Sequence, residues 1–209
     1  MILPFIRVSE LTLVLALCAA AAAQAAPSGQ RDPDWPCQQI KVLHLSLEAV
    51  WSGPQLDRQR DDWRQDQQVV DLVQEIAQRR VPIEQAQEKI RAFAAQTANQ
   101  KQPKLLDVLS GLFSVLDQER SAVIAGLDRF GARQKELAAE LRDDNEKLRT
   151  MQADPKSDPT DIAQMTPRIT WEAQVFQDRR QALRYACDVP GTIEQRLFVL
   201  ARTIQEALQ

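Results

Sequence analysis

The chain has 209 residues, of which 44% are hydrophobic, only 5% are aromatic and 26% are charged, with six glycines. This composition favours helices over a sheet sandwich, and the length is sufficient to bury one core. The formal net charge of -3 argues against nucleic acid or an acidic membrane surface as the main partner, because both require a basic stripe on the protein.

Residues 1–25 have the pattern of a secretory signal peptide. Arg7 supplies a positive charge, the apolar run 11–23 is too short for a comfortable membrane span, and Ala23-Gln24-Ala25 matches a signal-peptidase site. We expect cleavage after Ala25 and a periplasmic or secreted protein without a transmembrane segment. The alternatives are an uncleaved anchor and a lipoprotein. The lipoprotein is disfavoured because leucine stands where a lipobox before Cys18 needs a small residue.

Residues 26–209 are predicted to form a single all-α domain in three parts. Residues 26–60 contain four prolines and no clear helical period, which indicates an extended N-terminal arm with a short helical stretch near 46–50. Residues 61–129 and 188–209 are assigned to a helical bundle, and residues 130–187 to a long antiparallel hairpin of two coiled-coil helices. We expect Trp35 and Trp51 in the arm to be packing anchors, with a ligand clamp as the alternative.

The bundle begins with two predicted helices. The first spans about 61–80, with Asp61 and Asp62 at its positive end and Arg79 and Arg80 at its negative end, as the helix dipole favours. A Val-Pro pair then breaks the chain, and the second helix spans about 83–97. These two helices should form a hairpin of their own.

A sustained heptad pattern predicts one long helix over about 104–151. Its positions alternate in steps of four and three, which is the period of a left-handed coiled coil. We call these positions the seam: Leu109, Phe113, Leu116, Arg120, Val123, Leu127, Phe130, Gln134, Leu137, Leu141, Asp144, Leu148 and Met151.

The Asp-Pro-rich segment 154–159 predicts a turn, after which a second apolar stripe returns along the seam. Folding about this turn pairs residues whose numbers sum to roughly 313, as in an antiparallel helix pair. Leu148 should therefore lie near Met165, and Asp144 near Arg168. We expect a second turn at 188–191, followed by a final helix opened by a capping box at Thr192.

Two cysteines, Cys37 and Cys187, remain after the leader. In an exported chain such a pair predicts one disulfide, which would fasten the extended arm at the base of the hairpin. Two free thiols or an intermolecular bond are the alternatives. A redox-active pair is disfavoured because the chain has no Cys-x-x-Cys arrangement.

The sequence contains no recognisable catalytic, metal-binding or cofactor-binding signature. His44 is the only histidine and has no local motif around it, so neither a catalytic triad nor a zinc site is predicted. We expect no cofactor, no bound metal and no enzymatic activity. Paired carboxylates such as Asp143 and Asp144 are interpreted as solvated helix faces.

Three polar residues interrupt the seam: Arg120, Gln134 and Asp144. Such residues usually fix helix register, and the pairing rule gives Asp144 a partner in Arg168 and Gln134 a partner in Arg179. The rule gives Arg120 no partner. It is therefore the best single candidate for a partner or ligand contact.

These observations favour a non-enzymatic scaffold or adaptor that contacts another envelope protein through the hairpin. A second hypothesis is a periplasmic ligand-binding bundle with a pocket formed by Trp51, Trp63, Phe113 and Arg120. A holdase-type chaperone and a hydrolase without a recognisable signature are further alternatives.

Overall fold

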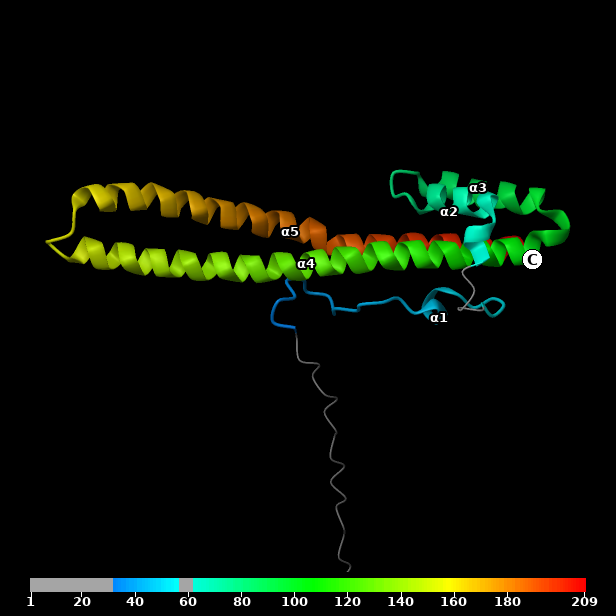
Figure 1. The fold of residues 1–209 in the computed structure, drawn as a ribbon, viewed down its shortest axis with the longest axis horizontal. Coiled ribbons are helices and arrows are strands. Elements are labelled where there is room, and N and C mark those ends of the chain that lie inside the picture. Colours follow the sequence, from blue (N-terminus) through cyan, green and yellow to red (C-terminus); the bar gives the residue numbers. More distant parts are fainter. Residues whose placement is uncertain (1–31, 57–61) are drawn as a thin grey trace, which may run out of the picture. The chain divides into compact units, whose positions relative to one another are not determined.

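The computed structural model (Figure 1) describes residues 32–56 and 62–209. All regular structure in these two ranges is helical, which confirms the predicted all-α class. The predicted signal peptide, its cleavage site after Ala25 and Cys18 lie outside the described residues. The elements in chain order are α1 (Leu47–Val50), the 3-10 turn η1 (Asp62–Gln65), α2 (Gln67–Ala77), α3 (Ile83–Gln96), the 3-10 turn η2 (Ala98–Gln100), α4 (Lys101–Ala153) and α5 (Pro159–Leu208).

The two longest helices form the predicted helical hairpin. The chain turns between Ala153 and Pro159, so that α4 and α5 pack against each other in opposite directions. Near this turn the two helices share a small apolar cluster in which Leu141, Met165 and Ile169 are buried. Leu137, Leu148, Met151, Ala173 and Phe176 pack around these three. The predicted antiparallel register is therefore confirmed.

A larger core lies at the other end of the α4–α5 pair, beside α2 and α3 (Figure 1). It combines apolar side chains from α1, η1, α2, α3, the first part of α4 and the last part of α5. Here α4 buries residues outside the seam as well, because other helices besides α5 pack against it. Val108, Leu112 and Ile124 are buried although they lie off the seam, whereas the seam residues Phe113 and Val123 are only partly buried.

The start of α2 differs from the prediction. The helix begins after Asp66, whose carboxylate accepts hydrogen bonds from the backbone N–H groups of Gln68 (3.0 Å) and Val69 (3.4 Å). This is an N-terminal cap, in which a side chain replaces the partner that the first helical N–H groups lack. The acidic residue Asp62, predicted at the helix start, lies instead in the preceding 3-10 turn η1.

The second predicted turn is wrong, because α5 continues without interruption through residues 188–191. Pro190 removes one backbone donor but does not end the helix. Cys187, Pro190 and Ile193 are all buried, and their spacing of three residues places them on one helical face. Thr192 caps nothing: its hydroxyl donates to the carbonyl of Asp188 one turn earlier, at 3.2 Å. Tertiary packing therefore overrides the Pro-Gly signal.

Two glycines of α4 allow close approach of other segments. A Cβ on Gly111 would lie 2.9 Å from the ring of Trp63, so this glycine lets η1 pack directly on α4. A Cβ on Gly131 would lie 1.9 Å from the carbonyl oxygen of Asp34, so here the extended arm passes over the helix. The close contact at Gly131 fixes where the arm can lie.

Candidate functional site

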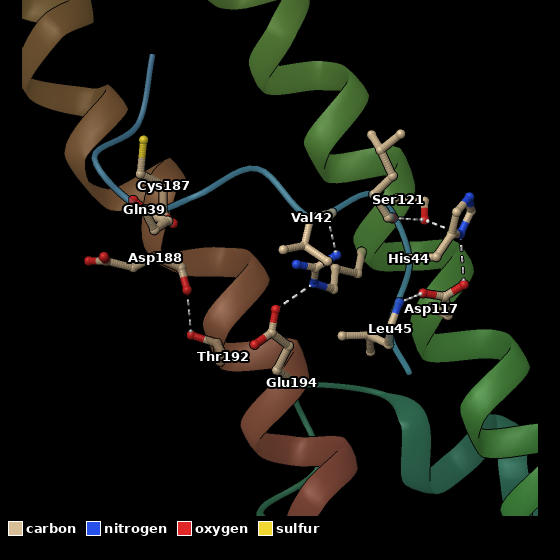
Figure 2. Close-up of polar contacts among 12 residues, drawn as sticks. Gln39, Val42, His44, Leu45, Asp117, Ser121, Cys187, Asp188, Thr192 and Glu194 are labelled. Carbon is tan, nitrogen blue, oxygen red and sulfur yellow. Dashed lines mark hydrogen bonds and ion pairs between the residues drawn. The ribbon is translucent and has the colours of Figure 1, made fainter. Parts of the chain in front are cut away.

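The extended arm lies across the α4–α5 pair around Arg120, the residue that the sequence singled out. Figure 2 shows this segment running from Gln39, beside Cys187 of α5, to Leu45, beside Asp117 of α4. Three features that the sequence showed separately, namely the cysteine pair, His44 and Arg120, therefore lie in one region. We call residues 32–45 the strap.

Arg120 is 4% exposed and joins three segments of the chain. Its Nε donates to a carboxylate oxygen of Glu194 in α5 at 2.6 Å, and its Nη1 donates to the carbonyl of Val42 in the strap at 2.6 Å. A buried guanidinium needs such partners, because an unpaired charge away from water is costly. The seam pattern predicted no partner for Arg120, because Glu194 and Val42 belong to segments that this pattern does not include. These contacts make it an internal anchor.

His44, Asp117 and Ser121 form a cluster with the composition of a catalytic triad. His44 Nδ1 lies 3.1 Å from Asp117 and 3.5 Å from the hydroxyl of Ser121, which itself donates to the carbonyl of Leu43 at 3.0 Å (Figure 2). In a working triad the two imidazole nitrogens face different partners, so that a proton can pass from serine to histidine. Here the same nitrogen faces both groups.

The remaining geometry of this cluster also favours a positioning role. The other oxygen of Asp117 accepts from the backbone N–H of Leu45 at 2.7 Å, and the imidazole of His44 is 73% exposed. These contacts tie the backbone of Leu43 and Leu45 and the side chain of His44 to one face of α4. The cluster therefore holds the strap against α4.

The three aromatic residues predicted to line a pocket with Arg120 belong to the larger core. Trp63 is buried against Gly111, Trp51 is buried and donates its Nε1 hydrogen to the carbonyl of Pro54 at 2.8 Å, and Phe113 is partly buried against the same cluster. The packing-anchor interpretation of Trp51 is thus the one that its burial supports. Arg120 is held separately, by Glu194 and Val42.

The two other polar seam residues behave differently from each other. Asp144 forms the predicted ion pair with Arg168, at 2.9 Å. Gln134 does not bind Arg179 as predicted; its amide nitrogen donates to the carbonyl of Phe176 at 3.4 Å. Gln134 is buried inside the hairpin, where its short side chain reaches only the facing backbone. Its Oε1 has no hydrogen-bond partner among the described residues.

Covalent and ionic contacts fasten the first half of the strap. Cys37 and Cys187 form the predicted disulfide, with their Cα atoms 5.7 Å apart, and the side-chain amide of Gln39 donates to the carbonyl of Cys187. Lys41 contacts Asp32 of the strap at 2.6 Å and Asp128 of α4 at 2.7 Å. Hydrogen bonds to Asp128 and then to Asp32 raise the pKa of Lys41, and the bond from Lys41 lowers the pKa of Asp32.

A polar groove separates strap residues 36–39 from the outer face of α5. Glutamine and arginine side chains dominate its α5 wall: Gln174, Gln177, Arg180, Gln181 and Arg184, with Asp178 and Asp188 between them. Next to this wall α5 exposes two large aromatic side chains, Trp171 (67% exposed) and Tyr185 (73% exposed). Neither aromatic was predicted as a site residue from the sequence, because neither belongs to the apolar stripe that faces α4.

None of the helices within 32–56 and 62–209 has the length and apolarity needed to cross a membrane. The same residues contain no cluster of His, Cys, Asp and Glu side chains suited to a metal ion. Comparisons with protein-family models, with curated proteins and with solved structures give no match for this chain.

Proposed function

We propose that this protein is an exported, non-enzymatic helical scaffold or adaptor that acts in the periplasm and contacts another envelope protein through its hairpin, residues 130–187. The observation that carries the proposal is Trp171, which is 67% exposed on the hairpin. Tryptophan is one of the side chains most enriched among the residues that dominate the binding energy of protein interfaces. Its ring has a large apolar area whose burial by a partner would be favourable.

The build of the hairpin supports the same function. Its apolar cluster holds three buried side chains, far fewer than the larger core. The hairpin therefore contributes little to the free energy of unfolding, although it exposes a large surface. Dense charge on the hairpin, including Glu146, Arg149 and Arg142, keeps it hydrated and can be recognised by a partner of complementary charge.

The ligand-binding hypothesis has less support. It requires Arg120 and the aromatic residues to face a common space, whereas Arg120 is bound by Glu194 and Val42 and both Trp51 and Trp63 are core side chains. The hydrolase hypothesis loses support from the geometry of His44, whose one nitrogen faces both Asp117 and Ser121. The adaptor is therefore the function we put forward.

A matched deletion tests the proposal. Removing residues 134–151 and 162–179 takes about five full turns from each helix, so the remaining residues keep their helical phase and the 154–158 turn is retained. We expect the shortened protein to keep its disulfide and cooperative unfolding, but to lose its envelope partner in chemical cross-linking of intact cells. Capture of the same partner with unchanged yield would move the contact site to the bundle.

Export is tested separately, by the intact mass of protein released by osmotic shock. Cleavage after Ala25 predicts a mature chain that starts at Ala26. A holdase would be recognised by suppression of client aggregation in the same preparation. Suppression that survives the hairpin deletion would contradict the adaptor proposal.

A further inference from the structure

The outer face of α5 carries a second heptad stripe, separate from the stripe that packs on α4. Its residues follow one another in steps of four and three: Trp171, Val175, Asp178, Ala182, Tyr185 and Val189. At 100° per residue, Trp171 lies about 140° around the helix from Phe176, which packs in the hairpin cluster. The second stripe therefore faces away from α4.

Most of this stripe is uncovered in the described structure. Trp171 and Tyr185 are 67% and 73% exposed, Asp178 and Ala182 are also exposed, and Val175 is half-buried. Only Val189 reaches the larger core, where it packs from the side. From Trp171 to Tyr185 the stripe extends about 21 Å along the helix, at 1.5 Å per residue.

The spacing indicates what kind of structure fits this face. An apolar repeat of 3.5 residues keeps one face of a helix in contact with a second helix over several turns, because the two wind around each other. A loop or a flat surface imposes no such period. Large aromatic side chains at both ends supply anchors of the type that dominate interface energetics.

The charges around the stripe indicate the chemistry of that helix. Asp178 sits at its centre, where its carboxylate accepts a hydrogen bond from Gln174 at 2.8 Å. Of the exposed arginines close by in sequence, Arg179 lies about 100° around the helix from Asp178 and flanks the stripe, whereas Arg180 and Arg184 lie about 160° and 120° away. Arg180 and Arg184 also line the groove beside the strap. A cation or an amide of a docked helix opposite Asp178 would complement this carboxylate.

We propose that Trp171, Val175, Asp178, Ala182 and Tyr185 form the docking site for one amphipathic helix of a partner protein, with a basic or amide residue opposite Asp178. The proposal rests on the proposed adaptor function and names the surface that performs it. The resulting contact would be a three-helix coiled coil made of α4, α5 and the partner helix.

A second copy of this chain fits the stripe less well. In a two-fold antiparallel pair, the register that places Trp171 against Tyr185 of the other copy also places Asp178 against Asp178, since 178 is the midpoint of the stripe. Two carboxylates would then face each other at the centre of the contact, where like charges oppose association. A helix with a cation or an amide at that position avoids this repulsion.

Site-specific photocross-linking in cells that naturally make the protein tests the proposal. The photoreactive amino acid p-benzoylphenylalanine replaces, one at a time, the stripe residues Trp171, Asp178 and Tyr185. The chain neighbours Thr170 and Gln177 serve as matched controls for Trp171 and Asp178, because they are also exposed but lie about 100° away around the helix. We expect at least tenfold higher cross-linking at the stripe positions, to a helical peptide that carries a basic or amide residue on its contact face.

Several results would overturn the proposal. These are equal yields at both sets of positions, adducts with the mass of two copies of this chain, adducts with lipid, and an absence of adducts. Trp171→Ser with Tyr185→Ser should reduce partner capture at least tenfold, whereas Phe198→Ser, at an exposed site on α5 outside the stripe, should leave it unchanged. If the hairpin deletion abolishes capture while the double variant does not, the adaptor function stands and this docking site is wrong.

Discussion

The two ends of the α4–α5 pair show how one helix pair can be held in two ways. Toward the 154–158 turn the helices bury little more than the seam, with Leu141, Met165 and Ile169 as the buried residues of their cluster. Beside α2 and α3 the same helices bury side chains on several faces, including Leu105, Leu109 and Leu200. The heptad repeat thus specifies which helices pair, while the additional off-seam apolar residues specify where a globular core forms.

The largest expected difference is between matched core truncations at the two ends. Leu109→Ala removes a fully buried side chain from the larger core and should lower the free energy of unfolding by about 3 to 5 kcal/mol. Leu148→Ala removes a partly buried side chain near the turn, where the helices can relax, and should cost about 1 kcal/mol. Urea unfolding followed by circular dichroism measures both. Equal losses would mean that the two ends form one equally packed core.

Loss of a buried polar side chain should likewise lower the free energy of unfolding more in the bundle than in the hairpin. Arg196 is buried in the bundle, where its guanidinium donates twice to the carbonyl of Ile76 (2.7 and 2.9 Å) and once to that of Val81 (2.9 Å). Burial lowers the pKa of Arg196, which nonetheless stays charged. Arg196→Met removes these donors from the carbonyl of Ile76, in α2, and from that of Val81, between α2 and α3, and should cost about 3 kcal/mol.

The hairpin offers a matched control for Arg196. Arg168 pairs with Asp144 near the surface of the hairpin, and Arg168→Met should cost less than about 1 kcal/mol. Thermal unfolding of both variants at one salt concentration provides the comparison. A loss at Arg168 as large as that at Arg196 would contradict the view that the hairpin depends little on polar contacts.

Two glycines in the middle of the α4–α5 pair should respond in opposite ways to substitution by alanine. Gly131→Ala would place a methyl group 1.9 Å from the carbonyl oxygen of Asp34, so the strap must move, at a cost of roughly 1 to 3 kcal/mol. Gly191→Ala meets nothing within 4 Å and should stabilise α5 by up to about 1 kcal/mol, because alanine is the better helix former. Melting temperatures that shift in opposite directions would confirm both positions. Destabilisation by Gly191→Ala would indicate a break in α5 that the structure does not have.

Two helix caps give the smallest effects, and these depend on pH. Asp66 caps α2 and contacts Lys104 at 2.8 Å; the hydrogen bond with Lys104, followed by those from Val69 and Gln68, lowers its pKa below the ordinary 3.8. Because the folded-state pKa is lowered, the stabilisation is complete above about pH 4 and is lost as the pH falls through the folded value. Asp66→Asn should cost about 1 kcal/mol at neutral pH and nothing at the acidic limit.

Asp158 is the corresponding cap in the hairpin. Its carboxylate accepts from the backbone N–H of Thr160 at 2.7 Å, which lowers its pKa, so its contribution has the same pH dependence. Asp158→Asn should nevertheless leave the main unfolding transition in place and raise amide hydrogen exchange only in the first turn of α5. Faster exchange across the bundle would show that the two ends unfold as a single unit.

The sequence predicted the helix pairing better than the details that depend on tertiary contacts. The all-α class, the antiparallel register and the Asp144–Arg168 pair followed from a period of 3.5 and one strong turn signal. The break at 188–191 was wrong, because local Pro-Gly chemistry cannot reveal that Pro190 and Ile193 will be buried together. The start of α2 at Asp66 could have been found from its capping side chain.

The candidate site was harder to predict, because its residues come from distant segments. Arg120 lies 74 positions before Glu194 and 78 positions after Val42 in the chain, and no periodic pattern links such separations. Gln134 was paired with Arg179 on register alone, whereas a short amide reaches the facing backbone of Phe176 instead. The outer stripe of α5 was readable in the sequence, by testing each predicted helix for a second heptad face.

The disulfide also bears on the order in which the molecule is completed. The cysteines are separated by 150 positions, so Cys37 must remain a thiol while nearly all of the helical domain is added to the chain. Closing so long a loop by chance is entropically unfavourable, and the ends meet readily only once α4 and α5 have paired and the strap lies over Gly131. We therefore expect this bond to form late in folding, after the helices that bring the two cysteines together have paired.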